Sequence, residues 1–328
     1  TSVPIRRAFV YWRRASPICA HYLWLDKRGR SVGHLHDHYA PRVQRLVLEL
    51  QGLYTKLAQV LSARPDVLPL VYQRQLACVH DQMPSVPLDT EAVQRELHSL
   101  DIGMNEITIE STAVASASIG QVHRGTLYQD DRNVTIAVKM MHADIQERFR
   151  YDFQVFGWLC RLVLPEWKGM LHELRRQILE NEFNYTREAE HLNRVRQNMQ
   201  ELNVVVPRAV VWTDRLLVME WIDGKPLDQC LRQDFAQILG ADLADTFLET
   251  RKQELTSGQE TLLSQQMLDN LGRIQKLQLW NLLRKYRRYA HQLVQVHGHQ
   301  IFVDGLFNGD PHYGNVLLTS DNKLGLID

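Results

Sequence analysis

Three side chains near the C-terminal end of the sequence could handle a nucleotide phosphate. Asp310 and Asn315 lie five residues apart in FNGDPHYGN, and Asp328 follows the hairpin-like stretch VLLTSDNKLGLI. In phosphoryl-transfer sites one Asp orients or deprotonates the nucleophile, while an Asn and a second Asp bind Mg²⁺. The order therefore predicts Asp310 as the base and Asn315 and Asp328 as metal ligands. A polar loop before a hairpin is the alternative, but it has no need of an Asp directly after the hairpin.

A lysine far upstream could hold the phosphate oxygens. Lys139 ends the strand-like run NVTIAVK, and a lysine there reaches phosphates when an acid from a neighbouring helix holds its side chain. Glu188, in the helical stretch that follows, is the candidate for that acid. Taken alone, the triplet AVK indicates no more than a solvated lysine at a strand end. The order of strand, helix and Asp-Asn-Asp segment favours a site for ATP and Mg²⁺.

A loop of small residues could cover the phosphates. It lies in VASASIGQVH, and its backbone amides and hydroxyls could donate to phosphate at Ala115, Ser116, Ala117 and Ser118. Because these residues carry Cβ atoms where glycine would have none, the loop should be stiffer and more crowded than a glycine-rich one. The alternative is a small-residue turn between strands that binds no ligand.

A second segment has the pattern of a hinge beside adenine. Glu220 and Ile222 follow the apolar strand LLVM and precede a glycine, so their backbone groups could pair with the base while their side chains are incidental. Met219 would then lie at the back of the nucleotide pocket. The alternative for Met219 is an ordinary core position.

Hydrophobic spacing predicts helices before and after a small sheet. Apolar residues recur every three or four positions from Pro41 to Ser62, and this helix places Lys56 and Gln59 on one face. The β-branched runs of residues 106–141 predict an antiparallel sheet with a turn at QDDRN. Further predictions are a helix at 89–100, a long helix at 175–199, strands at 204–207 and 216–219, and helices from 226 to 302. Within the last range, the polar, glutamine-rich piece between Gly240 and Lys276 has the pattern of an insertion or of a flexible helical excursion.

Composition describes a globular chain without an excess of either charge. Of its 328 residues, 45% are hydrophobic and 23% are charged, and the formal net charge is +0, which argues against nucleic acid as a partner. Four cysteines without a CxxC pair favour a reducing compartment over a zinc site or a disulfide framework. His34, His36 and His38 alternate, as for a metal site along an extended strand, but we favour a polar surface. No apolar window reaches the about 20 residues of a membrane-spanning helix.

Two basic segments each have two interpretations. Four arginines between residues 6 and 14 precede any acidic residue, as in an organelle transit sequence, although a basic first helix fits equally well. The run RKYRR at 284–288 suits a phosphate or membrane surface, or a solvated helix face, which is the interpretation we favour. Because the sequence begins with Thr and ends on a motif residue, we expect a longer protein.

Six segments together resemble the UbiB or ADCK group of atypical kinases, the aarF-domain proteins linked to coenzyme Q biosynthesis. They are GLYTKLAQVLSARPDVLP, VASASIGQVH, AVK, ENEFNYTREAEHLN, VMEWIDG and GLFNGDPHYGN, within about Ala40 to Asp328. The resemblance implies an α+β, protein-kinase-like two-lobe fold with an N-terminal helical extension and a truncated C-lobe. It implies a basic segment or targeting remnant at 1–40, a helical extension at 41–105, an N-lobe at 106–222 and a partial C-lobe with the catalytic loop at 223–328.

The same resemblance implies roles for further residues. Lys56 and Gln59 match a KxGQ-like motif on an extension that folds over the active site, where a protein substrate would otherwise lie. Glu182 matches the acidic motif of the long helix, and Glu188 matches the glutamate that pairs with the phosphate-binding lysine. The implied ligands are ATP or ADP and Mg²⁺, with ATP hydrolysis or phosphorylation of a small lipid-like molecule. The implied partners are prenylquinone-biosynthesis enzymes and membrane lipids. A mitochondrial location follows, on the matrix side of the inner membrane, with a plastid as the alternative, and the oligomeric state stays open.

The sequence departs from the usual family residues at four places. Ala58 stands where glycine is usual, Asn184 where aspartate is usual and Tyr313 where proline is usual, and Asn308-Gly309 also differs. Alanine is the better helix former, so the helix should tolerate Ala58. Because Asn184 is neutral, it removes from the pocket a negative charge that would act on Mg²⁺ or on the lysine there.

Two classes of function stay open. Retention of the lysine, the glutamate and the Asp-Asn-Asp set favours a magnesium-dependent ATPase or small-molecule kinase that supports prenylquinone synthesis. Asn184 and the crowded loop favour a nucleotide-occupied pseudokinase that organises enzymes or lipids. An ordinary protein kinase is disfavoured by the missing glycine-rich loop and the covering helix. Without the C-lobe helices that would follow Asp328, we expect this chain by itself to be unstable or inactive.

Overall fold

The chain has an α+β fold, as the sequence predicts, and it divides into two compact units. The first unit consists of residues 1–189 and 210–219, and the second consists of residues 190–209 and 220–328. The computed structural model describes residues 3–62, 64, 66–77, 85–103, 106–129, 131–257, 269–308 and 313–327.

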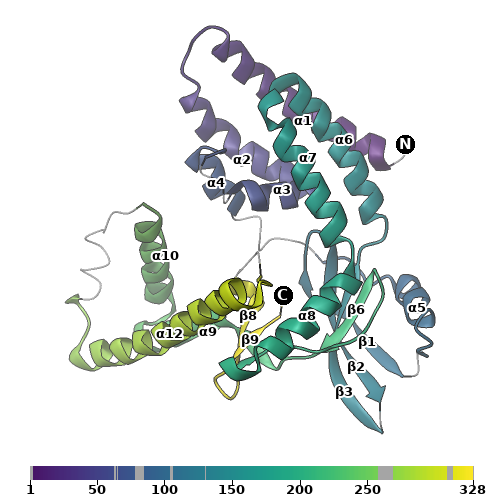
Figure 1. Cartoon of the computed structure of the whole chain (residues 1–328). Coiled ribbons are helices and arrows are strands. Elements are labelled where there is room, and N and C mark those ends of the chain that lie inside the picture. The colour runs from purple at the N-terminus through teal and green to yellow at the C-terminus, as the bar shows by residue number, and fades with distance from the viewer. Residues whose placement is uncertain are drawn as a thin grey trace. The chain divides into compact units, whose positions relative to one another are not determined.

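The first unit combines N-terminal helices with a sheet. Its helices begin with α1 (Val3–Asp26), α2 (Gly33–Leu50), α3 (Leu53–Ser62), α4 (Leu70–Ala77) and α5 (Thr90–His98), and continue after the sheet with α6 (Ile145–Val163), the 3₁₀ turn η1 (Pro165–Trp167) and α7 (Lys168–Gln177). Helix α6 packs against both α1 and α7 (Figure 1). An ion pair between Arg7 and Asp152, whose carboxylate is almost fully buried, joins α1 to α6.

The single helix predicted from Pro41 to Ser62 is wrong, because the structure has two. Helix α2 continues through Pro41 and ends at Leu50, and α3 begins at Leu53. Between them Gln51 and Gly52 both have positive φ, of 53° and 56°, which no α-helix accommodates. The apolar spacing persists across the break because both helices bury their leucines in the same unit, so periodicity alone could not reveal it.

The antiparallel sheet predicted for residues 106–141 is confirmed and is larger than predicted. Its five strands lie in the order β1-β2-β3-β6-β5. They are β1 (Ile107–Ser116), β2 (Gly120–Gln129), β3 (Arg132–Met141), β5 (Ala209–Trp212) and β6 (Leu216–Glu220). In the antiparallel pairing of β2 with β3, Lys139 lies opposite Val122. The sheet therefore places this lysine on a central strand near the β1–β2 turn.

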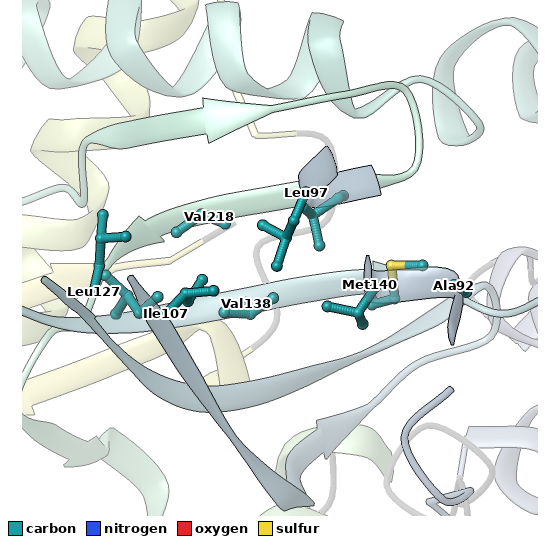
Figure 2. Packing of buried hydrophobic residues seen from close by; sticks show 10 residues of the cluster. Ala92, Leu97, Ile107, Leu127, Val138, Met140 and Val218 are labelled. Atoms are coloured by element: carbon teal, nitrogen blue, oxygen red, sulfur yellow. The ribbon is translucent and has the colours of Figure 1, made fainter. Parts of the chain in front are cut away.

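One face of the sheet is covered by α5. Figure 2 shows Leu97 and Ala92 of this helix in one cluster with Ile107, Val138 and Val218 of the strands, and all five side chains are buried. The predicted helix at 89–100 is confirmed, and it begins where Asp89 caps it by accepting a hydrogen bond of 3.0 Å from the N–H of Ala92. This packing fixes β3 between two neighbouring strands.

The long helix predicted at 175–199 is also wrong, because it is broken. Helix α7 passes into a π-helical turn, η2 (Ile178–Glu182), and a new helix, α8 (Tyr185–Asn198), begins after Phe183 and Asn184. The side-chain oxygen of Asn184 accepts a hydrogen bond of 2.9 Å from the N–H of Arg187 and so caps the new helix. A π turn widens the helix by one residue per turn and shifts the faces of the residues after it.

The second unit contains a smaller sheet and the C-terminal helices. Its strands have the order β4-β9-β8-β7. They are β4 (Val204–Val205), β7 (Gly224–Pro226), β8 (Val316–Thr319) and β9 (Leu324–Leu326). The helical elements are the 3₁₀ turn η3 (Gln200–Leu202), α9 (Leu227–Leu239), α10 (Ala241–Ser257), α12 (Arg273–His299), the π turn η4 (Gln300–Asp304) and the 3₁₀ turn η5 (Tyr313–Asn315).

The strand predicted at 204–207 is shorter than predicted and belongs to this smaller sheet, where it pairs with β9 in parallel. The predicted hairpin before residue 328 is confirmed, because β8 and β9 pair antiparallel. The predicted helical character of 226–302 is confirmed for the described residues, including the first part of the proposed insertion. Helices α9, α10 and α12 pack around Phe235, Phe247 and Leu279. None of the helices in the described ranges combines the length and apolar character needed to cross a membrane.

Candidate functional site

The central feature of the site is an ion pair inside the first unit. Nζ of Lys139, on β3, lies 2.6 Å from Oε1 of Glu188, on the first turn of α8. The two side chains are only 17% and 30% exposed, so the lysine ammonium is held between the sheet and the helix with limited access to water. This is the contact that the sequence analysis expects between these residues. A lysine held in this way presents a fixed cation to an anionic ligand.

The start of α8 is attached to the sheet by its own hydrogen bonds. The N–H of Tyr185 donates to the carbonyl of Asp214 over 3.2 Å, and the hydroxyl of Thr186 donates to the Asp214 carboxylate over 3.0 Å. Asp214 lies between β5 and β6, next to the strand that neighbours β3. Because the first turn of α8 is fixed at this point, Glu188 reaches Lys139 from a defined position.

A second lysine pair joins the N-terminal helices to the segment before α8. Nζ of Lys56, on α3, lies 2.6 Å from Oε1 of Glu182, the last residue of the π turn. Gln59 lies one turn later on the same helix and is half-buried, while Ala58 between them is buried at 2% exposure. The structure thus brings Lys56 and Glu182 into contact. Ala58 lies within the regular helix α3, which accommodates it.

The loop of small residues is a tight connection between β1 and β2. Ala115 and Ser116 are the last residues of β1, and the N–H of Ala117 donates to the carbonyl of Gly120 over 2.8 Å. Ser118 is buried at 7% exposure, whereas Ala115 and Ala117 are exposed. The structure therefore gives the proposed phosphate loop a short, hydrogen-bonded turn that ends one strand away from Lys139.

The segment expected to act as a hinge carries a charged side chain with two partners. Within the second unit, Oε2 of Glu220 lies 2.5 Å from Nη1 of Arg196, and Oε1 lies 3.3 Å from Nε of Arg208. The N–H of Glu220 donates to the carbonyl of Arg208, so this amide is already used within the protein. Ile222 is buried at 8% exposure and Met219 at 6%. The Glu220 side chain, expected to be incidental, fixes the segment in place.

Of the Asp-Asn-Asp set, Asn315 is described. It ends the turn η5, and its carbonyl accepts a hydrogen bond of 3.2 Å from the N–H of Ile327. The hairpin therefore brings residue 327 back beside Asn315. Asp310 and Asp328 lie outside the described residues, so their roles stay predictions.

Histidines and acids in the described ranges form no cluster of three or more that could hold a metal ion. His34, His36 and His38 lie on helix α2 and not on an extended strand, so the geometry considered for a strand metal site is wrong. Nδ1 of His36 lies 2.7 Å from the hydroxyl of Tyr22. In the basic run at 284–288, Lys285 pairs with Asp234 over 2.8 Å within the helical part of the second unit.

One histidine beside the loop has a shifted pKa. His142 follows β3, and its backbone N–H donates to the carbonyl of Ile119 over 3.0 Å. Burial lowers the pKa of its imidazole below the ordinary value of 6.5, and the nearby guanidinium of Arg148 lowers it further. Neutral imidazole is therefore the form that this position favours.

Two residues near Lys139 were missed by the sequence analysis as parts of the site. The Lys139 Nζ lies 5.1 Å from the ring centroid of Tyr185, which is fully buried. Gly120 is the second, because a Cβ atom at this position would lie 2.7 Å from the hydroxyl oxygen of the same tyrosine. The signal for Tyr185 was available in principle, because it precedes Glu188 by three positions and residues with this spacing share a helix face.

Comparison with known protein families matches residues 79–260 and 268–328, most of the chain, to the ABC1 atypical kinase-like domain. A solved Mycobacterium tuberculosis structure, Rv3197 in complex with erythromycin, is 22% identical with a TM-score of 0.48, and the match covers 90% of this chain and 65% of that one.

Three curated relatives have similar sequences. An uncharacterised Synechocystis protein, slr0889, is 28% identical over 87% of this chain and 62% of its own length. ACTIVITY OF BC1 COMPLEX KINASE 3 of Arabidopsis thaliana, a chloroplastic protein, is 25% identical over 93% of this chain and 38% of its own. AarF domain-containing protein kinase 1 of Gallus gallus is 25% identical over 87% and 47%. The chain spans less than two thirds of the length of each of these relatives.

The family match extends over the sheet, the Lys139–Glu188 pair and the Asn315 segment. It confirms the resemblance that the sequence motifs indicate, and with it the kinase-like fold class. The chain belongs to the ABC1 atypical kinase-like family, the group of the UbiB and aarF-domain proteins.

Proposed function

We propose that this chain supplies the nucleotide site of an enzyme that binds ATP or ADP with Mg²⁺ and catalyses ATP hydrolysis or phosphoryl transfer to a small lipid-like acceptor. The observation that carries the proposal is the 2.6 Å ion pair between Lys139 and Glu188. A solvated lysine at a strand end would have no need of a carboxylate from a separate helix. A lysine that binds phosphate oxygens needs one, because the carboxylate fixes where the ammonium lies.

The remaining residues would supply the rest of the chemistry. Asp310 would orient or deprotonate the nucleophile, and Asn315 and Asp328 offer the oxygen atoms that Mg²⁺ prefers. Mg²⁺, when bound, neutralises negative charge on the phosphates. The backbone and hydroxyl groups of the 115–118 turn would donate to phosphate oxygens, and the segment from Glu220 to Ile222 would border the base.

The helical extension supports a small acceptor in preference to a protein. Lys56 contacts Glu182 in the segment that leads into α8, so α3 is attached six residues before the glutamate that holds Lys139. We propose that this attachment limits access for a peptide and leaves room for a compact substrate. The substrate class that fits the family resemblance is a prenylquinone precursor or a related lipid.

The cellular setting follows from the same proposal. Prenylquinone-biosynthesis enzymes and membrane lipids would be the partners, at the matrix side of the mitochondrial inner membrane. A plastid is the alternative, and it is supported by a relative whose name marks it as chloroplastic.

A second function, a nucleotide-occupied scaffold without turnover, is favoured by Asn184. Its amide caps α8 as an aspartate would, yet it brings no negative charge to the site. If that charge is needed to couple the metal or the lysine to catalysis, nucleotide would bind and not be hydrolysed.

Turnover of ATP with Mg²⁺ by the protein and its Asp328→Asn and Lys139→Arg variants separates these functions. The enzyme predicts turnover that both substitutions abolish. The scaffold predicts nucleotide binding without turnover in any of the three proteins. Phosphate transfer to generic peptides would contradict both proposals.

A further inference from the structure

The tyrosine that precedes Glu188 contacts the same lysine from another direction. Tyr185 is fully buried, and its ring centroid lies 5.1 Å from Nζ of Lys139. Glu188 lies 2.6 Å from the same nitrogen. Tyr185 and Glu188 are three residues apart on the first turn of α8, so one turn of helix offers the ammonium both a carboxylate and an aromatic face.

An aromatic face at this distance attracts a cation. The ring quadrupole places negative potential over the ring, and the attraction is stronger where water is excluded. Lys139 is 17% exposed, so part of its hydration shell is replaced by protein groups. A carboxylate alone restricts the distance of the ammonium, whereas a carboxylate and a ring together restrict its direction as well.

The other end of the tyrosine lies against the turn of the small-residue loop. A Cβ atom on Gly120 would lie 2.7 Å from the Tyr185 hydroxyl oxygen and 2.5 Å from the carbonyl oxygen of Met140. Gly120 accepts the hydrogen bond from Ala117 that closes the turn between β1 and β2. The hydroxyl therefore packs directly beneath the base of the loop, where only glycine fits.

We infer that Tyr185 is a positioning residue that fixes the ammonium of Lys139 with its ring and the base of the 117–120 turn with its hydroxyl. It does not touch the ligand. It sets the relative position of two elements that, under the proposed function, bind the same phosphates. This inference rests on the proposed function, because the two elements act together only if both bind phosphate. The effects of the two contacts can nevertheless be measured without nucleotide.

The test is the rate at which an amine-reactive acetylating reagent modifies Lys139 in the full chain, followed by peptide mass spectrometry. Lys27 and Lys225, both exposed, serve as internal references. Loss of the ring in Tyr185→Leu should raise the relative rate at Lys139 roughly two- to five-fold, because the ammonium form loses stabilisation. Tyr185→Phe keeps the ring and should react like the wild type.

The hydroxyl contact has its own readout in the same variants. Hydrogen exchange of the amides of residues 117–120 should rise several-fold in Tyr185→Phe, although labelling of Lys139 does not change. Tyr185→Leu should change both measurements. This division between the two variants is not expected from a tyrosine that merely fills the core.

Phe149→Leu is the matched control, because Phe149 is another fully buried aromatic residue of the first unit. It should reduce stability without raising the labelling rate of Lys139. Equal acceleration by Phe149→Leu and Tyr185→Leu would overturn the inference, since it would indicate general loosening. An unchanged labelling rate of Lys139 in folded Tyr185→Leu would overturn it too. If the leucine variant does not fold, Tyr185→Met takes its place, with the same expected and contradicting results.

Protection by nucleotide separates this inference from the proposed function. MgATP should slow the labelling of Lys139 in the wild type if the lysine binds phosphate. Absence of protection at saturating MgATP would reject the nucleotide site. The labelling rates of the variants, measured without nucleotide, would still decide the role of Tyr185.

Discussion

The two lysine–glutamate pairs of the first unit have the same length but very different supports. Lys139 and Glu188 lie 2.6 Å apart on a central strand and a regular helix turn. Lys56 and Glu182 also lie 2.6 Å apart, but α3 follows a sharp break at Gln51-Gly52 and Glu182 ends a π turn. The first pair is built on regular elements, and the second depends on two local irregularities.

The difference suggests a division of roles. A charge fixed between a strand and a helix stays in place while a ligand binds, as a phosphate-binding cation must. A pair held by irregular backbone can open at lower cost, which suits an extension that admits and covers a substrate.

Removal of each lysine should separate the two roles. Lys139→Met should reduce ATP turnover by about 10²-fold or more, because one preorganised charge at the phosphates is lost. Lys56→Met should reduce turnover far less. Steady-state turnover with saturating MgATP measures both, and similar losses in the two variants would show that the pairs do not differ in role.

The contact beneath the loop should have the largest effect on stability. Gly120→Ala should lower the free energy of unfolding by about 2–3 kcal/mol, because its Cβ would lie 2.5 Å from a backbone oxygen that cannot move freely. Gly169→Ala, on α7 with nothing within 4 Å of the added atom, should be neutral or slightly stabilising. Urea unfolding of both variants gives the comparison, and equal stability would mean that the turn tolerates a side chain.

A glycine in place of Gln51, at the break between α2 and α3, should stabilise the protein. Gln51 has φ 53° and ψ −160°, a region that side chains rarely adopt, so Gln51→Gly should stabilise the protein by about 1 kcal/mol. Gly52→Ala should destabilise it, because Gly52 has φ 56° and its added Cβ would lie 3.3 Å from the Phe149 ring. Thermal unfolding measures both, and destabilisation by Gln51→Gly would contradict the strained break.

Loss of the second ion pair should loosen α3 more than it destabilises the fold. Glu182→Gln should change the free energy of unfolding by less than about 1 kcal/mol, because both side chains are partly exposed to water. Hydrogen exchange of residues 53–62 should nevertheless rise. Glu173→Gln, which removes an exposed pair with Arg176 on α7, is the control and should leave exchange in α3 unchanged.

The smallest expected effect is on the pH dependence of stability. Burial lowers the pKa of His142 in the folded protein below the 6.5 of an unfolded chain, so the unfolded state binds more protons between these two values. Stability from this group is complete above pH 6.5 and is lost as the pH falls through the folded pKa. His142→Gln should make unfolding less dependent on pH between 7.5 and 5.5, while His98→Gln, at an exposed position of α5, should not.

Sequence patterns predicted the parts of the fold that have strong local signals. The sheet of residues 107–141 follows from β-branched runs and a turn, and the helix predicted at 89–100 is observed as α5, which Asp89 caps. The breaks at 51–52 and 178–184 were missed, because buried leucines keep helical spacing through the first and no residue type marks a π turn.

For the site, the resemblance to a known family supplied the roles of Lys56 and Glu182, and local chemistry supplied those of Lys139 and Asn315. The contact of Tyr185 with Gly120 could not be predicted, since it joins a helix to a turn 65 residues away and depends on the packing of both.

An ATP acyl-phosphate probe transfers its acyl group to lysines that lie beside bound nucleotide phosphates, so it reports whether Lys139 is such a lysine. If Lys139 binds phosphate, mass spectrometry should find it as the principal acylated lysine, and MgATP should compete the labelling away. Acylation of Lys139 no faster than that of exposed Lys27, or labelling that excess MgATP does not reduce, would contradict a phosphate-binding role for Lys139.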